Sequence, residues 1–138
     1  MDIEEAVIAI EPYALRKGVG VGIKIREQCE EAGLEVCGVS YKHLSEKQAK
    51  LFYEEYKGKP CFDDLVSAIS NGCSMFIHLK GEDAIQKVRN INGVINPAKA
   101  KPGTIRHDFP SAGGPFNLVD LSGNRASFAR KKNLVFDD

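Results

Sequence analysis

Long apolar runs are missing from this sequence, although hydrophobic residues make up 43% of it. No stretch approaches the roughly 20 consecutive apolar residues that a helix needs to span a bilayer, so we expect no membrane span. The residues Met1 to Glu5 are rich in acidic side chains. They lack the positive region and the apolar stretch of a secretory signal. We therefore expect the protein to remain in the cytoplasm.

An excess of charge of either sign is also absent. The 19 lysine and arginine side chains balance the 19 aspartate and glutamate side chains, and the formal net charge is +0. Proteins that bind nucleic acid or an anionic membrane by electrostatic attraction usually carry a clear excess of basic residues. The composition therefore predicts neither nucleic acid nor a membrane as a partner.

Cysteine and histidine residues are few and scattered. Cys29, Cys37, Cys61 and Cys73 form no C-x-x-C pair, and the 3 histidines do not cluster. Zinc sites and disulfide frameworks need closely spaced ligands or a dense set of cysteines. We expect no metal site, and we expect the four thiols to be reduced and mostly buried.

A single compact domain, spanning residues 1–138, is what a chain of this length predicts. Apolar or alternating segments predict strands, and apolar residues at helical spacing predict helices. The predicted strands are 7–10, 34–41, 73–79 and 133–136, and the predicted helices are 19–31, 45–56, 62–70, 82–90 and 125–132. Residues 91–124, rich in Gly, Pro, Asn and Lys, predict a long irregular segment, which in a small domain is usually functional.

The order of these elements predicts the fold class. We expect an α+β ferredoxin-like sandwich, in which helices pack on a four-stranded antiparallel sheet. Glu11-Pro12 closes the first strand and predicts a loop, because proline donates no hydrogen bond to a sheet. Ser45 to Gln48 has the sequence of a capping box and predicts the start of a helix.

Two segments of the chain resemble nucleoside diphosphate kinases. Residues 52–62 read F-Y-E-E-Y-K-G-K-P-C-F, which is similar to the family's H-Y-x-x-x-K-x-[KR]-P-F-F. Residues 93–97 and 101–109 read G-V-I-N-P and K-P-G-T-I-R-H-D-F, which is similar to the family's G-x-T-N-P…P-G-T-I-R-G-D-F. Such a long and irregular match implies the family's fold over nearly the whole chain.

The same resemblance aligns Asp120 with the histidine that the family phosphorylates. From Asn117 the family reads N-x-x-H-G-S-D, whereas this chain reads N-L-V-D-L-S-G. The register continues without a gap to Phe136, which matches the family's terminal aromatic residue, although one extra residue must fit between Pro110 and Phe116. The resemblance therefore implies a divergent member that lacks the catalytic histidine.

Five ligand-binding positions of the family are retained. The resemblance implies that Tyr53 contacts the phosphate side of the site and that Phe62 stacks on the nucleobase. It implies that Arg89 and Arg106 bind phosphates and that Asn117 hydrogen-bonds the ribose. A cleft for a nucleotide or a nucleoside-like ligand is therefore expected.

The departures from the family lie at the phosphate end of this cleft. The family's lysine after the first strand is Glu11 here, which we expect to change the local charge by two units, and the arginine before the asparagine is Phe116. The glutamate that orients the family's histidine is Lys131. We keep Glu11 and Phe116 as ligand-site residues, and we expect a salt bridge between Asp120 and Lys131.

Three functions fit this pattern. The first is a kinase-inactive protein that binds a nucleotide or nucleoside-like ligand. The second is a repurposed enzyme, in which Asp120 acts as acid or base on a nucleoside-like or sugar-like substrate and Lys131 tunes it. The third is an active kinase that forms an aspartyl phosphate. The Asp120–Lys131 pair could equally serve the fold alone. His107 is a weaker candidate for a substitute base.

The resemblance also bears on cofactors and assembly. The expected ligand is a nucleotide, accompanied by Mg²⁺ where it carries several phosphates. The family forms dimers that assemble into tetramers or hexamers. We expect a homodimer here, with the tetramer and the hexamer as alternatives.

Overall fold

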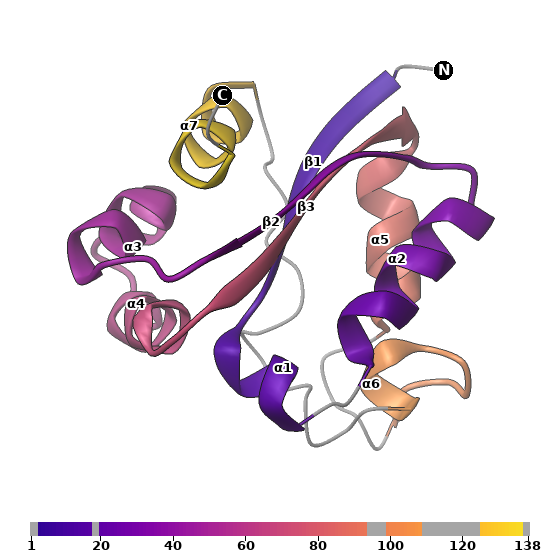
Figure 1. Cartoon of the computed structure of the whole chain (residues 1–138), viewed down its shortest axis with the longest axis horizontal. Coiled ribbons are helices and arrows are strands. Elements are labelled where there is room, and N and C mark those ends of the chain that lie inside the picture. Colours follow the sequence, from indigo (N-terminus) through magenta and orange to yellow (C-terminus); the bar gives the residue numbers. More distant parts are fainter. Residues whose placement is uncertain (1–2, 18–19, 94–98, 109–124, 137–138) are drawn as a thin grey trace.

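An antiparallel sheet of three strands forms the centre of the molecule (Figure 1). The structure is a computed structural model that describes residues 3–17, 20–93, 99–108 and 125–136. The strands are β1 (Ile3–Ile10), β2 (Glu35–Lys42) and β3 (Ser74–Glu82), and their order in the sheet is β1-β3-β2. Because β3 is central, it pairs with both other strands.

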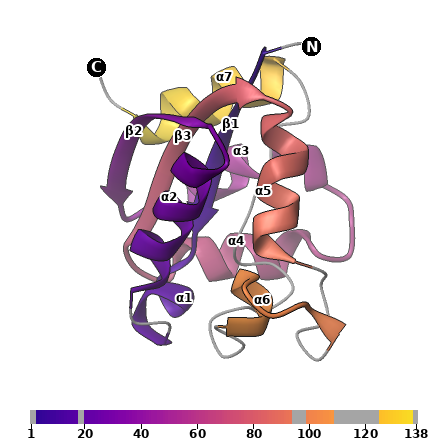
Figure 2. The same ribbon diagram turned by 90° about the vertical axis from the view of Figure 1, so that its right-hand side faces the viewer.

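Helices cover both faces of this sheet (Figures 1 and 2). One face is covered by α2 (Val21–Glu31) and α5 (Ala84–Asn92), and the other by α3 (Glu46–Phe52), α4 (Phe62–Ser70) and α7 (Arg125–Val135). Three short helices complete the described residues: α1 (Pro12–Lys17), the 3₁₀ helix η1 (Glu54–Tyr56) and α6 (Ile105–Asp108). The predicted α+β class, with helices packed on an antiparallel sheet, is confirmed.

The alternation of side chains along the strands creates two apolar cores. Ile8 and Ile10 of β1 and Ile77 of β3 belong to the core beneath α2 and α5. Val7 of β1 and Phe76 of β3 belong to the core beneath α3, α4 and α7. Successive residues of a strand point to opposite faces, so every second residue of β1 and β3 serves the same core.

The starts of two helices can be compared with the predictions from local sequence signals. The capping box is confirmed: Ser45 Oγ accepts from Gln48 N at 3.1 Å, and Gln48 Oε1 accepts from Ser45 N at 2.9 Å. The loop expected after Glu11 is wrong, because Pro12 begins α1 instead. Proline suits the first position of a helix, where its missing N–H has no intrahelical partner to lose.

The C-terminal segment is the largest correction to the predicted fold. Residues 133–135 continue α7 rather than forming a strand, and Phe136 N donates to Lys132 O at 2.8 Å. Side chains of β2 satisfy the last carbonyl groups of this helix: Ser40 Oγ donates to Val135 O at 2.7 Å, and Lys42 Nζ donates to Leu134 O at 2.9 Å. The described part of the chain therefore contains three strands where the sequence predicted four.

α7 also rests on the sheet through aromatic contacts. The imidazole of His78 on β3 lies 5.2 Å from the ring of Phe128 and 6.0 Å from that of Phe136, measured between centroids. Its Nε2 lies 3.0 Å from Oε1 of Glu5 on β1. The imidazole thus packs against the aromatic rings at the C-terminal end of the chain and pairs with β1 through its Nε2.

The thiols are less buried than expected. Cys29 is buried and Cys61 is half-buried, but Cys37 and Cys73 are exposed. Cys37 lies at the irregularity in the pairing of the edge strand β2, and Cys73 precedes β3. Within the described ranges, no cluster of His, Cys, Asp and Glu could hold a metal ion, and no helix is long and apolar enough to cross a membrane.

Candidate functional site

Two of the predicted site residues, Tyr53 and Lys131, are brought together by the fold. Tyr53 follows α3 and is almost fully buried, and Lys131 lies on α7 with no exposed surface. The Lys131 ammonium lies 6.0 Å from the centre of the Tyr53 ring and 5.3 Å from that of Phe52. Phe62, at the start of α4, packs against the same core. The hairpin of α3, η1 and α4 and the helix α7 therefore share one site.

The two predicted phosphate-binding arginines lie on two other helices, α5 and α6. Arg89 is exposed in the last turn of α5, which covers the opposite face of the sheet from α3. Arg106 belongs to α6, which packs against α5, and its side chain is not among those described. The described residues therefore place the two arginine positions on neighbouring helices, α5 and α6.

Three predicted site residues lie outside the described residues: Phe116, Asn117 and Asp120. The expected salt bridge between Asp120 and Lys131 therefore stays a prediction.

Glu11 stands where β1 ends and the chain turns into α1. Its side chain is 1% exposed, and neither carboxyl oxygen has a hydrogen-bond partner among the described residues. Burial raises the pKa of Glu11 from 4.5 to about 8, because water no longer stabilises the charged form. Glu11 is therefore mostly uncharged at neutral pH, and the expected change of two charge units relative to a lysine is wrong. The change is about one unit.

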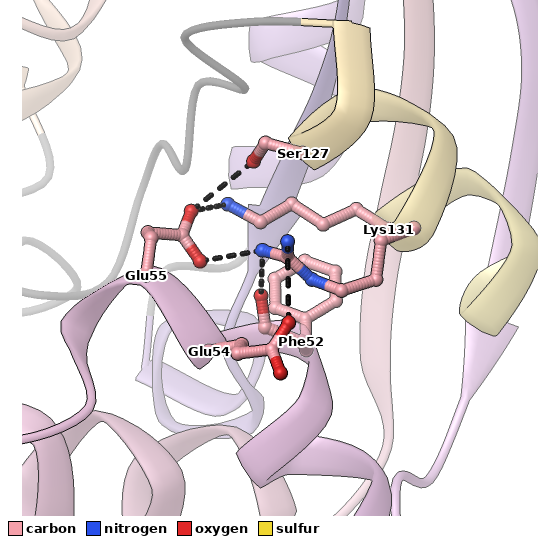
Figure 3. Close-up of polar contacts among 6 residues, drawn as sticks. Phe52, Glu54, Glu55, Ser127 and Lys131 are labelled. Carbon is pink, nitrogen blue, oxygen red and sulfur yellow. Dashed lines mark hydrogen bonds and ion pairs between the residues drawn. The ribbon is translucent and has the colours of Figure 1, made fainter.

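Lys131 belongs to a cluster of polar side chains centred on Glu55 of η1 (Figure 3). Glu55 Oε2 accepts hydrogen bonds from Lys131 Nζ and, at 3.3 Å, from Ser127 Oγ. Glu55 Oε1 accepts from Arg130 Nη2 at 2.6 Å. Three donors from α7 thus converge on a single carboxylate of the hairpin.

Arg130 reaches two further groups of the hairpin. Its Nη2 donates to Phe52 O at 3.4 Å, and its Nη1 lies 3.7 Å from Glu54 Oε2. The Glu54 carboxylate is mostly exposed, so this second ion pair is weak. The stronger contacts of α7 are therefore those to Glu55.

The charges in this cluster affect the titration of Glu55. Its partial burial alone would raise the pKa of this carboxyl group. The hydrogen bond from Lys131 and the positive charges of Lys131 and Arg130 outweigh that effect, so the pKa of Glu55 is lower than its ordinary value. Glu55 is therefore a carboxylate at neutral pH.

Sequence reasoning did not identify Glu55. Its partners Ser127, Arg130 and Lys131 have the spacing i, i+3, i+4, which places them on one face of a helix. That spacing is the signal that could have indicated a shared partner for α7. It could not have shown that the partner is Glu55, which is about 75 residues away in the sequence.

His107 is less suited to act as a base in this site. It lies exposed on α6, and its Nδ1 is 2.9 Å from Oδ1 of its neighbour Asp108. The hydrogen bond from His107, and a second one from Gly103 N, lower the pKa of Asp108. No described contact connects His107 with Tyr53 or Lys131.

Comparisons with known proteins bear on this site. The family model described as nucleoside diphosphate kinase matches residues 4–138. A nucleoside diphosphate kinase of Methanocaldococcus jannaschii is 35% identical over 136 residues, which cover 98% of this chain and 94% of the relative. One from Myxococcus xanthus is 42% identical over 112 residues, which cover 81% of this chain and 76% of the relative.

Solved structures give the same result. Aquifex aeolicus nucleoside diphosphate kinase matches with a TM-score of 0.80 and 28% identity, covering 96% of this chain and 94% of that one. A halophilic nucleoside diphosphate kinase from Halobacterium salinarum, in complex with CDP, matches with a TM-score of 0.77 and 31% identity, covering 99% and 90%. These likenesses confirm the predicted ferredoxin-like fold class.

Proposed function

Because the chain belongs to the nucleoside diphosphate kinase family, we propose that it binds a nucleotide or nucleoside-like ligand but does not transfer phosphate through a phosphohistidine. The proposal has two parts, ligand binding and the loss of the family's chemistry. They are supported by different observations and are tested separately.

The main support for the loss of phosphohistidine chemistry is the lysine at position 131. The resemblance implies that the family holds a glutamate at this position to orient the nucleophilic histidine. An ammonium group only donates hydrogen bonds, so it cannot accept one from an imidazole N–H as a carboxylate does. Lys131 is fully buried and bound to Glu55, which makes it a settled part of the fold rather than a surface substitution.

Two further positions support this part of the proposal. Asp120 is aligned with the histidine itself, so the imidazole nucleophile is missing from the sequence at that position. Glu11 is a buried and mostly uncharged acid where the resemblance implies a phosphate-binding lysine. Phosphoryl transfer depends on cations that neutralise the charge of the transferred group, so each loss weakens the same reaction.

Ligand binding is supported by the retained positions and by a relative. Tyr53, Phe62, Arg89, Arg106 and Asn117 match the family's ligand-binding residues. The Halobacterium salinarum enzyme, 31% identical, was solved in complex with CDP. We propose a nucleotide as the ligand, with Mg²⁺ carried by its phosphates when it has more than one.

Incubation with γ-labelled ATP tests the chemistry. We expect no label on the protein and no transfer to a second nucleoside diphosphate. An acid-labile label would indicate a phosphohistidine and overturn the proposal. An acid-stable, hydroxylamine-sensitive label that disappears in Asp120→Asn would instead establish an aspartyl phosphate.

Isothermal titration calorimetry tests the binding. We expect measurable affinity for at least one member of a series of nucleosides and nucleoside mono-, di- and triphosphates. Absence of heat across the whole series would contradict the binding part, whatever the labelling result.

The expected homodimer also remains a proposal, and light scattering coupled to size-exclusion chromatography measures it directly.

A further inference from the structure

Gln28, near the C-terminal end of α2, is hydrogen-bonded to a segment 75 residues further along the chain. Its side-chain Nε2 donates to the carbonyl oxygen of Gly103 at 3.0 Å. We infer that Gln28 is a positioning residue for the proposed nucleotide site, because this hydrogen bond holds the segment that carries Arg106 against α2. This role rests on the proposed function, in which Arg106 binds a phosphate of the ligand.

The turn before α6 and α6 itself are joined by their own hydrogen bonds. Thr104 Oγ1 donates to Lys101 O at 2.7 Å, and Asp108 N donates to Thr104 O at 2.9 Å. Asp108 Oδ1 accepts from Gly103 N at 3.2 Å, which connects the end of α6 with the turn. Turn and helix therefore form one unit, so a shift of Gly103 also shifts the backbone at Arg106.

Apolar contacts attach this unit to the fold as well. Ile105 is 1% exposed and belongs to the core beneath α2 and α5. Gly93, at the end of α5, lies so close to Thr104 that a Cβ atom on Gly93 would be 2.8 Å from Thr104 Oγ1. Figures 1 and 2 show α6 at this end of α5.

These contacts and the hydrogen bond from Gln28 have different effects. Burial of Ile105 stabilises the unit against α2 and α5, but apolar burial has no preferred direction. A hydrogen bond weakens steeply when its angle changes. Gln28 therefore favours one orientation of the turn, whereas Ile105 keeps the unit attached to the core in several orientations.

The orientation of the turn affects ligands that need Arg106. The apparent Kd of such a ligand is its intrinsic Kd divided by the fraction of molecules with the correct orientation. A nucleoside has no phosphate for Arg106 to bind, so its Kd does not depend on this fraction. Loss of the Gln28 hydrogen bond should therefore weaken nucleotides and leave nucleosides unaffected.

Gln28→Met tests this role, because methionine has a similar length and cannot donate to Gly103 O. Calorimetry with adenosine and ADP gives the ratio of the adenosine Kd to the ADP Kd, in which any loss common to both ligands cancels. A hydrogen bond changes an equilibrium by a factor of about two to ten, and the ratio falls by no more than that. We expect the ratio to fall about threefold.

Gln48→Met is the matched control. Gln48 is also a half-buried glutamine of a helix, and it also loses one hydrogen bond, from Ser45 N at 2.9 Å. It lies on α3, which covers the other face of the sheet from α2. We expect its ratio to change by less than about 1.5-fold, which is an effect on stability alone. A purely structural role of Gln28 predicts that both variants lower the melting temperature and that neither changes the ratio.

A double-mutant cycle tests whether Gln28 acts through Arg106, and it needs ADP alone. Arg106→Gln should weaken ADP about tenfold, as expected for the loss of a charge-assisted hydrogen bond. In the Arg106→Gln background, Gln28→Met should weaken ADP no further, because no guanidinium group remains to be positioned. If Gln28→Met does not fold, Thr104→Val takes its place, since it removes the hydrogen bond to Lys101 O within the same turn.

The outcomes separate this role from the proposed function. Additive losses in the cycle, or an unchanged ratio in the variants that fold, overturn the positioning role while nucleotide binding stands. Binding of adenosine without binding of ADP to the wild-type protein also overturns it, and leaves a nucleoside-like ligand. Absence of binding across the whole calorimetric series overturns both.

Discussion

At the scale of single residues, Glu11 links the site to the stability of the fold. Its pKa is about 8 in the folded chain, against an ordinary value of 4.5. Below pH 4.5 the group is protonated in both the folded and the unfolded state and costs nothing. Between pH 4.5 and about 8 the unfolded chain releases this proton and the folded chain does not, so the free energy of unfolding falls.

Glu11→Gln should remove this pH dependence. We expect the variant to gain stability relative to the wild type by about 1.4 kcal/mol for each pH unit between 5 and 8. Urea unfolding of both proteins at pH 5, 6.5 and 8 measures the difference. A difference that does not grow with pH would show that Glu11 titrates normally in the folded chain.

A second prediction at this scale concerns the stability of the Glu55–Lys131 pair. Glu55→Gln removes the Glu55 carboxylate from the side of the buried Lys131 ammonium, and we expect a loss of about 3 kcal/mol in the free energy of unfolding. The double variant Glu55→Gln/Lys131→Met should recover most of that loss, because methionine fills a similar volume without charge. Chemical unfolding at pH 7 checks both values, and an equally unstable double variant would contradict the expected role of the pair.

The sequence predicted some residues of the site but not their partners. Tyr53 and Lys131 could be placed in one site because the resemblance aligns each of them with a site residue of the family. Glu55 could not, because its role depends on the distance between η1 and α7 in the folded chain. The uncharged state of Glu11 was missed for the same reason, since burial of a side chain at the end of a strand is a property of everything packed around it.

At the scale of elements, the C-terminus of α7 depends on side chains of β2. The Lys42 ammonium donates to Leu134 O, where the partial negative charge at the end of a helix favours a cation. We expect Lys42→Met to lower the free energy of unfolding by about 1 kcal/mol and to increase hydrogen exchange in the last turn of α7.

Lys47→Met serves as the control for this prediction. Lys47 is an exposed lysine of α3, so the substitution has the same chemistry without a helix end to cap. We expect a change in stability of less than about 0.5 kcal/mol. Equal losses in the two variants would show that the contact between Lys42 and Leu134 contributes nothing of its own.

Elements that depend on local sequence signals could be predicted, whereas the end of α7, which depends on distant contacts, could not. The helix beginning after Ser45 and the core strands were correct, because a capping box and apolar alternation are local signals. Residues 133–136 were assigned to a strand because they are short and apolar. Their helical form depends on Ser40 and Lys42, more than 90 residues away, and no local pattern contains that information.

At the scale of the whole molecule, the two cores share the strand β3. Ile77 belongs to one core and its neighbour Phe76 to the other. If β3 leaves the sheet, apolar side chains of both cores are therefore exposed to water. We therefore expect a single cooperative unfolding transition, as is usual for a domain of this size.

Ile77→Val tests this coupling. We expect it to cost about 1 kcal/mol, and we expect the midpoints in far-ultraviolet and near-ultraviolet circular dichroism to shift together. The near-ultraviolet signal reports on Tyr53 and Tyr56, which belong to the core that Ile77 does not enter. A shift confined to the far-ultraviolet signal would show that the two faces of the sheet unfold separately.

The central place of β3 also matters while the chain is being made. Among the described strands, β1 is hydrogen-bonded to β3 and not to β2, so its pairing in this sheet is complete only when Glu82 has been synthesised, 72 residues after Ile10. At about 5 to 20 residues per second, this takes roughly 4 to 14 s. During that time the apolar run from Ala6 to Ile10, fully buried later, is exposed on the nascent chain. The growing polypeptide, more than the finished protein, is therefore the form that a chaperone would need to protect.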